Sequence, residues 1–140
     1  MLTLALALLQ AAAVPQLQPP SADWRSRPTN AGSWTWRNAA DVSEAVFSDS
    51  RGPQFLVRCT RSTRRVNLLR VGAPAGQPIR IATTSSERQL PPANMLLASD
   101  PLLDAIAFSR GRLWVDVTGV MPLVLRSAPE PARAVEDCRS

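Results

Sequence analysis

From residue 33 onward, apolar and polar side chains alternate with a period of two, and this alternation constrains the fold more than any other feature. In QFLVRCT (54–60), Phe55, Val57 and Cys59 share one face and the residues between them share the other. Successive side chains of a strand point to opposite faces, so the stretch predicts a strand with one buried face. Similar stretches are SWTWR (33–37), AVFSD (45–49), RRVNLLRV (64–71), IRIATT (79–84), RLWVDVTG (112–119) and VMPLVLR (120–126).

Short polar or Gly/Pro-rich turns join these stretches, which favours antiparallel neighbours. We therefore predict a mainly β domain over residues 33–140, an antiparallel β-sandwich or rolled sheet of six to seven strands. A turn or short helical stub is expected at NAADVSE (38–44). Pro122 predicts that the last strand lies at a sheet edge, because proline cannot donate a ladder hydrogen bond.

Two segments interrupt the alternation and predict helices. In SDPLLDAIAFSRG, Asp100 stands where an N-cap belongs, Pro101 at the first helical position and Gly111 where a C-cap belongs. In SAPEPARAVEDCRS, Ser127 and Glu130 have the spacing of a capping box. That box predicts a C-terminal helix over residues 128–138.

The N-terminus has the pattern of an export signal. The apolar run LTLALALLQAAAV (2–14) is too short for a bilayer core, which needs roughly 20 residues. Ala11 and Ala13 are small residues suited to cleavage, so we predict a signal peptide over residues 1–13 and no transmembrane segment after its removal. The absence of Arg and Lys before the run departs from the usual signal, and a buried N-terminal helix is the alternative.

Residues 14–32 are rich in Pro, Ser and Asn and show no periodicity, so we expect a flexible leader ahead of the domain. Trp24 is the one leader residue that could dock onto another surface. The alternative is that it is an incidental aromatic residue.

Export decides how the two cysteines are interpreted. In an oxidising compartment, Cys59 and Cys138 most economically form one disulfide, and Cys138 falls on the apolar stripe of the predicted C-terminal helix. The strand and the helix would then present both sulfurs to the same core. A zinc site is not expected, because the chain has no histidine to complete one.

Composition removes most catalytic constellations. All 16 basic residues are arginine, against 11 acidic ones, and Lys, His and Tyr are absent. The usual general base, Schiff-base lysines and phosphate-loop lysines are therefore missing, and no cofactor is expected. Carboxylates such as Asp100 and Asp104 are the remaining acid–base candidates, which leaves a carboxylate hydrolase as a weak alternative to a non-enzymatic protein.

The densest charge feature is RCTRSTRRVNLLR, with no acid within it. On a hairpin its arginines would create a field that attracts phosphate or carboxylate groups. The alternative is a solvated face that the chain's own acids neutralise. No aromatic residues interleave with the arginines, which argues against nucleic acid. The candidate anion-binding residues are Arg58, Arg61, Arg64, Arg65 and Arg70.

A second charge feature joins FSRGR (108–112) to EDCR (136–139). Acids in the last turn of a helix oppose its dipole, so Glu136 and Asp137 need a partner. We predict that one of them pairs with Arg110 or Arg112, and that Arg133 supports Asp137 from one turn earlier. These contacts would stabilise the fold.

Several stretches resemble a family of small exported proteins of alphaproteobacteria. They are WRNAADVSEAVF, FLVRC, VNLLR, LLDAIAFSRGRLWVDVTG, PLVL and ARAVEDCR, with the SRGR and terminal EDCR motifs most specific. The resemblance covers about residues 34–139, and it implies no activity because none is established for that family. In layout alone, the early and late cysteines are similar to type VI secretion-associated TagO/VasI and invasion-associated locus B proteins.

Taken together, these features predict a non-enzymatic binding or accessory protein of the bacterial cell envelope, periplasmic or secreted. Its expected partner is an envelope protein or an anionic envelope polymer. The runner-up is direct binding of anionic lipid or polysaccharide through residues 58–70.

Overall fold

The computed structural model describes residues 24–140. The expected signal peptide and the first part of the expected leader, up to residue 23, lie outside the described residues. The elements in chain order are η1 (Trp24–Ser26), β1 (Ser33–Asn38), β2 (Val42–Asp49), β3 (Gly52–Thr60), β4 (Arg65–Arg70), β5 (Ile79–Ala82), β6 (Glu87–Leu90), β7 (Leu96–Leu97), α1 (Pro101–Ala107), β8 (Arg112–Asp116), β9 (Leu123–Arg126) and α2 (Pro129–Asp137).

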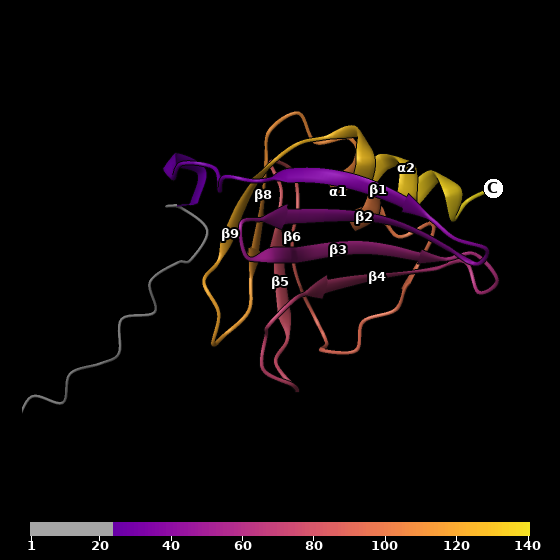
Figure 1. Cartoon of the computed structure of the whole chain (residues 1–140), viewed down its shortest axis with the longest axis horizontal. Coiled ribbons are helices and arrows are strands. Elements are labelled where there is room, and N and C mark those ends of the chain that lie inside the picture. The colour runs from indigo at the N-terminus through magenta and orange to yellow at the C-terminus, as the bar shows by residue number, and fades with distance from the viewer. Residues whose placement is uncertain (1–23) are drawn as a thin grey trace, which may run out of the picture.

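The strands form two antiparallel sheets, which confirms the predicted sandwich. One sheet has the order β1-β2-β3-β4-β7 and the other β6-β5-β8-β9. Figure 1 shows the strands of the four-stranded sheet running across those of the five-stranded sheet, with the helices behind the latter. Within residues 24–140, no helix combines the length and apolar character needed to cross a bilayer.

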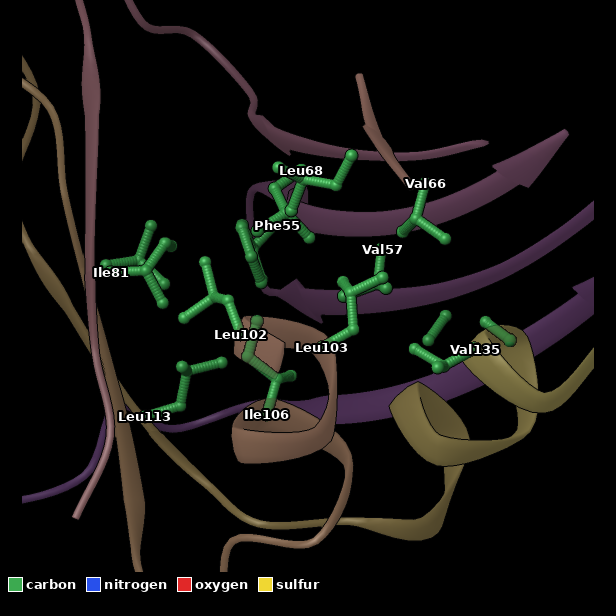
Figure 2. Packing of buried hydrophobic residues seen from close by; sticks show 14 of the residues in the cluster. Phe55, Val57, Val66, Leu68, Ile81, Leu102, Leu103, Ile106, Leu113 and Val135 are labelled. Atoms are coloured by element: carbon green, nitrogen blue, oxygen red, sulfur yellow. The ribbon is translucent and has the colours of Figure 1, made fainter. Parts of the chain in front are cut away.

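One apolar core fills the space between the sheets and the two helices. The alternation in β3 places Phe55, Val57 and Cys59 in this core, as the sequence predicts. Leu102 and Leu103 of α1 enter it from the opposite side, and Figure 2 shows them facing the β3 and β4 side chains. Burial of these large side chains contributes about 1.5 to 3 kcal/mol each, so the core supplies most of the favourable free energy.

The described chain has nine strands where the sequence predicted six to seven. β6 was missed because its sequence, ERQL, exposes three polar residues in a row and shows no alternation. β7 was missed because it has only two residues and is held through pairing with Arg65 and Val66 of β4. Both strands depend on tertiary partners more than on a local pattern.

Of the two alternatives expected at residues 38–44, the structure has the turn, over residues 39–41, and not the helical stub, because β2 already begins at Val42. Ser43 and Glu44 are buried strand residues, and each has polar partners across the sheet or on α2. Buried polar groups are tolerated only when such partners exist. The sequence alone could not show those partners.

Of the predicted helix caps, the N-cap of α1 agrees with the structure, whereas the C-cap of α1 and the capping box of α2 do not. Asp100 does cap α1, accepting a hydrogen bond from the Leu102 amide at 2.8 Å. Gly111 is not the C-cap, because the helix ends at Phe108. The capping box of α2 is also wrong, since Ala128 is the N-cap and no side chain caps the helix.

The expected flexible leader is wrong for residues 24–32. Trp24 is only 1% exposed and stacks on Trp114 with ring centroids 6.4 Å apart. Together with Ala82 and Val124 these rings form a second apolar cluster on the four-stranded sheet. Composition predicted disorder here because a single buried aromatic residue carries little weight in a polar stretch.

Two asparagines cover sheet edges. Asn30 lies against edge strand β9, its amide donating to the Val124 carbonyl and its side-chain oxygen accepting from the Val124 amide, both at 2.7 Å. Asn94 makes the equivalent pair of bonds to Leu68 of β4 with its side chain alone, both at 2.9 Å. Open strand edges invite unwanted pairing, so these contacts protect the sandwich. The edge position predicted for the last strand is confirmed.

Candidate functional site

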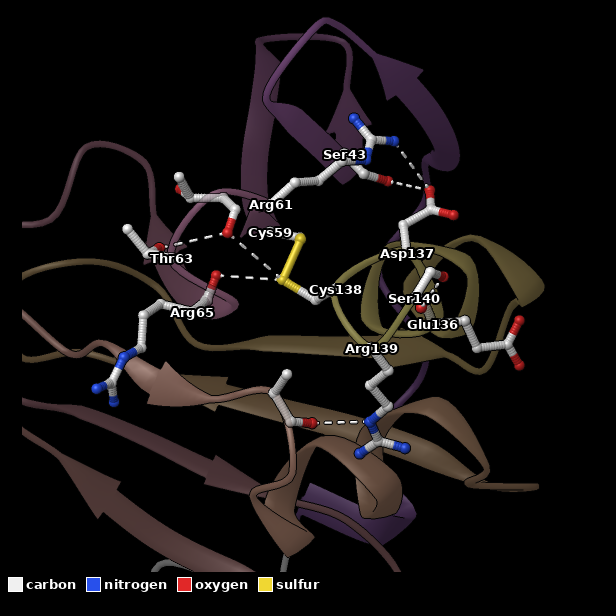
Figure 3. Close-up of a disulfide and its surroundings, with 12 residues drawn as sticks. Ser43, Cys59, Arg61, Thr63, Arg65, Glu136, Asp137, Cys138, Arg139 and Ser140 are labelled. Atoms are coloured by element: carbon white, nitrogen blue, oxygen red, sulfur yellow. Dashed lines mark hydrogen bonds and ion pairs between the residues drawn. A yellow bond between two sulfur atoms is a disulfide. The ribbon is translucent and has the colours of Figure 1, made fainter.

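The predicted disulfide joins Cys59 of β3 to Cys138 at the end of α2, with Cα atoms 5.5 Å apart. Both cysteines are buried. Figure 3 shows the bond at the C-terminal end of the molecule, between α2 and the turn that joins β3 to β4. The last turn of the chain is therefore tied covalently to the centre of the five-stranded sheet.

A polar network surrounds this bond. The Ser43 hydroxyl donates to the Asp137 carboxylate at 2.5 Å and accepts from the Trp36 indole at 2.9 Å. Arg61 donates to the same carboxylate at 3.4 Å and to the Ala39 carbonyl at 2.8 Å. The network links β1, β2 and the β3–β4 turn to the end of α2. It explains why an acid is placed against the helix dipole.

The predicted pairing of Asp137 or Glu136 with Arg110 or Arg112 is wrong. Asp137 binds Ser43 and Arg61 instead, and Arg112 donates to backbone carbonyls of residues 25 and 27 in the N-terminal segment. The sequence does not show these partners, because Ser43 and Arg61 are distant from Asp137 along the chain and only the fold brings them together.

Arg133 does not form the predicted pair with Asp137. Its guanidinium lies 3.6 Å from the centroid of the Trp36 ring, a cation–π contact between α2 and β1. The Glu136 side chain is exposed and makes no hydrogen bond or ion pair with a described residue. Arg133 therefore docks α2 onto β1, and of the two acids only Asp137 forms an ion pair with a described residue.

The five arginines of the predicted anion-binding cluster are divided by the fold. Arg58 binds Glu44 at 2.7 Å on the outer face of the five-stranded sheet, where Arg37 binds the same carboxylate at 2.5 Å. Arg61 is engaged with Asp137. Arg64 and Arg65 make no side-chain hydrogen bond or ion pair within residues 24–140. A continuous patch of five free guanidinium groups is not formed.

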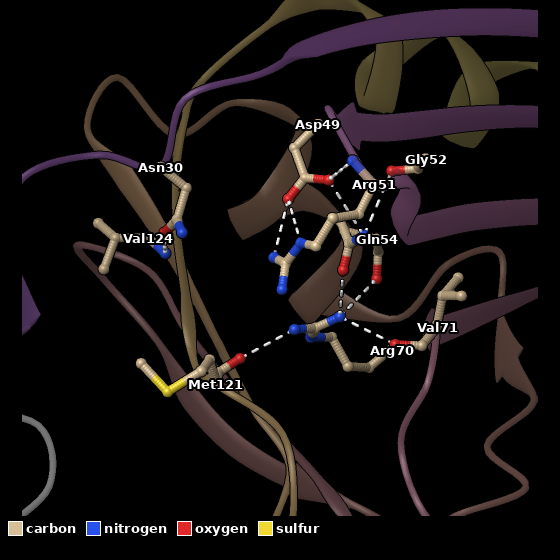
Figure 4. Close-up of polar contacts among 9 residues, drawn as sticks. All are labelled: Asn30, Asp49, Arg51, Gly52, Gln54, Arg70, Val71, Met121 and Val124. Atoms are coloured by element: carbon tan, nitrogen blue, oxygen red, sulfur yellow. Dashed lines mark hydrogen bonds and ion pairs between the residues drawn. The ribbon is translucent and has the colours of Figure 1, made fainter.

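Arg70 is the last residue of β4, and its guanidinium links neighbouring loops by hydrogen bonds. Its guanidinium donates to the Val71 and Met121 carbonyls at 2.9 Å and to the Gln54 side chain at 3.0 Å, as Figure 4 shows. Partial burial lowers the pKa of this guanidinium, and nearby Arg51 acts in the same direction. Arg70 is therefore a structural residue, not part of an anion site.

The acid–base candidates are engaged in structural contacts. Asp100 caps α1 and pairs with Arg88 at 2.5 Å, while Asp104 pairs with Arg139 at 2.8 Å. Within residues 24–140, no three metal-ligating side chains gather in one place. Both carboxylates are therefore engaged in ion pairs with arginines.

An open groove of about 670 Å³ lies between α1 and the turn from β5 to β6. We call it the α1 groove. Sequence reasoning missed it, although Phe108 falls off the apolar stripe of the helix, which could have marked an exposed aromatic residue. Its polar and aromatic lining consists of Thr84, Ser85, Ser86, Asp104, Phe108, Ser109 and Arg110.

The comparisons with known proteins add no relative. No family model, curated protein or solved structure matches the chain. The resemblance carried by the SRGR and EDCR motifs therefore stays a prediction.

Proposed function

We propose that this chain is an exported, non-catalytic binding protein of the bacterial cell envelope. The buried Cys59–Cys138 bond carries the proposal, because disulfides persist in oxidising compartments such as the periplasm and are rare in the cytosol. The apolar run at residues 2–14 supports export independently.

The residue types present and the pairs they form support a binding role. The chain has no histidine or lysine to act as a base, and Asp100 and Asp104 are already paired with arginines. Accessible arginines and an exposed aromatic ring remain, and both are common anchors in recognition surfaces. Recognition needs only these groups, whereas catalysis needs a positioned base or nucleophile.

Fractionation of the native cell with thiol trapping tests the proposal. We expect the protein in the periplasmic or secreted fraction, shortened at its N-terminus, with both thiols protected until reductant is added. Affinity capture from the same envelope material, with a cysteine-free variant as bait control, should then retrieve a partner or polymer. Cytosolic protein with two free thiols would contradict the proposal.

Anionic lipid or polysaccharide binding at the β3–β4 turn is the second candidate. Arg64 and Arg65 favour it, since neither side chain is neutralised by a described acid. We expect the Arg64→Gln/Arg65→Gln variant to lose binding to phosphatidylglycerol vesicles or polygalacturonate at low salt, while Arg37→Gln, on the sheet face, keeps it. Equal loss in both variants would indicate a non-specific charge effect.

A further inference from the structure

We propose that the α1 groove binds an acidic oligosaccharide, a short sugar chain whose rings carry carboxylates. The inference rests on the proposed envelope function and names the ligand class. The groove brings together an unpaired guanidinium, an exposed aromatic ring and several hydroxyl groups. Each of these contacts a different part of an acidic sugar.

Arg110 supplies the charge. The neighbouring carboxylate, Asp104, is already paired with Arg139 at 2.8 Å, and Arg110 makes no hydrogen bond or ion pair with a described residue. The groove therefore has one uncompensated positive charge on a planar group that can bind a carboxylate through two parallel hydrogen bonds. A neutral ligand has no carboxylate to accept these two hydrogen bonds.

Phe108 supplies the apolar surface. It is 61% exposed at the end of α1, although the helix buries Leu102, Leu103 and Ile106 in the core. The ring thus contributes little to packing, and it lines the groove together with Arg110. The C–H face of a sugar ring is a flat apolar surface of matching size, whose contact with the ring would remove both from water.

Hydroxyl groups line the opposite wall. Thr84, Ser85 and Ser86 lie in the β5–β6 turn, and each hydroxyl both donates and accepts, as sugar hydroxyls do. The buried Thr83 hydroxyl accepts from the Ser85 and Ser86 amides at 3.2 and 3.0 Å, which holds this turn in place. The wall is therefore ordered before a ligand arrives, which reduces the entropy cost of binding.

Gly111 lets the two walls lie close together. A Cβ atom at this position would lie 2.5 Å from the methyl group of the exposed Thr84 side chain, so a larger residue would displace that side chain. The SRGR motif thus combines the charged residue, Arg110, with the glycine that brings the hydroxyl turn beside it.

The groove also has room for more than one sugar. A second groove of about 540 Å³ is lined by Arg64 and Arg139, and Asp104 borders both grooves. Arginines therefore line both grooves. A chain of sugars with repeated carboxylates offers a carboxylate to each groove, whereas a single small anion does not.

Calorimetric titration of the disulfide-bonded, exported protein with tetragalacturonate tests the site, with galactotetraose as the neutral probe. We expect binding of the acidic sugar at least about tenfold tighter than the neutral one, and about tenfold weaker binding in Arg110→Gln and in Phe108→Ala. Arg37→Gln removes the same charge from the outer sheet face and should stay within about twofold of wild type. Urea unfolding confirms that each variant is folded.

Equal affinity for the two sugars would overturn the proposal, as would no binding at all or an equal effect of Arg37→Gln and Arg110→Gln. Binding to phosphatidylglycerol vesicles without binding to tetragalacturonate would assign the surface to lipid instead. The fractionation experiment is separate. If the protein proves cytosolic but binds the acidic sugar through Arg110, the envelope role fails and the groove chemistry stands.

Discussion

The two ends of the described chain are anchored in opposite ways. The C-terminal end is tied by the Cys59–Cys138 bond and by the contact of Asp137 with Ser43. The N-terminal end, residues 24–32, is held without a covalent bond, through Trp24 in an apolar cluster and Asn30 along the edge of β9. Both ends close the sandwich, one across the core and the other along a sheet edge.

The difference concerns how each anchor stabilises the fold. A covalent tie acts mainly on the unfolded chain, whose conformations it restricts. The contacts at the N-terminal end act only in the folded state, where they cover apolar surface and backbone groups of the four-stranded sheet. The predictions below separate these contributions.

Loss of the disulfide should have the largest effect. The cysteines are 79 residues apart, and in the chain-entropy model a loop of that size corresponds to about 4.5 kcal/mol. We therefore expect Cys59→Ser/Cys138→Ser to lower the free energy of unfolding by several kcal/mol. Urea unfolding followed by circular dichroism measures it.

Reductant provides the control. It should lower the stability of the wild-type protein to that of the double variant and leave the variant unchanged. If reduction changes wild-type stability by less than about 1 kcal/mol, the non-covalent contacts alone hold the C-terminal end.

Loss of the Trp24 ring should have the second largest effect on the free energy of unfolding. Trp24→Ala removes a ring that stacks on Trp114, and truncation of a buried Trp costs about 3 to 5 kcal/mol. We place this change at the lower end, about 3 kcal/mol, because the cluster has only four members.

Trp24→Phe is the matched variant for this end. Within residues 24–140 the buried indole N–H of Trp24 has no hydrogen-bond partner, so its removal offsets part of the lost ring area. We expect a loss below about 1 kcal/mol for the phenylalanine variant. A loss below about 0.5 kcal/mol for Trp24→Ala as well would mean that the Trp24 ring does not anchor this end of the chain.

The two ends also differ in how far the sequence predicts them. Alternation and capping residues predicted the sandwich, α1 and the position of Cys138, because these depend on local periodicity. Asn30 and the partners of Asp137 were missed, and docking of Trp24 stayed one of two alternatives, because each meets a residue distant in sequence. In the candidate site, SRGR was visible as a motif, but only the fold shows that Arg110 shares a groove with the hydroxyl groups of the β5–β6 turn.

Substitution of the edge asparagines should lower the free energy of unfolding by less, and the loss should differ between Asn94 and Asn30. Asn94→Ala leaves both the amide and the carbonyl of buried Leu68 without a partner, a loss of about 2 to 3 kcal/mol. Asn30→Ala removes only the side-chain acceptor of the Val124 amide, because the other bond comes from its backbone, so we expect about 1 kcal/mol.

Aspartate substitutions make this comparison sharper. Asn30→Asp keeps the acceptor and should stay within about 0.5 kcal/mol of wild type. Asn94→Asp places a carboxylate oxygen against the Leu68 carbonyl and should be unstable at neutral pH, recovering as acid protonates the new carboxyl. Identical pH curves for the two aspartate variants would refute the assignment of donor and acceptor at Asn94.

The smallest effect is expected at Asp41, which holds the β3–β4 turn near the C-terminal end. Hydrogen bonds from the Ser62 side chain and amide hold the pKa of this carboxyl below its ordinary value. A carboxyl whose pKa is lower when folded stabilises the fold above its unfolded pKa, and this contribution is lost as pH falls through the folded pKa. The free energy of unfolding should therefore fall less steeply in Asp41→Asn than in wild type below about pH 4.

Urea unfolding at stepped pH measures that slope, and Asp49→Asn is the matched control. Asp49 also has a lowered pKa, caused by hydrogen bonds from Arg51, but it is the last residue of β2, at the end of the strand away from the disulfide. With the disulfide reduced, the β3–β4 turn loses its covalent neighbour, so the effect of Asp41→Asn should grow while that of Asp49→Asn stays constant. An unchanged effect of Asp41→Asn on reduction would mean that the covalent and polar contacts at the C-terminal end act independently, and equal growth in both variants would mean that reduction acts on the whole fold.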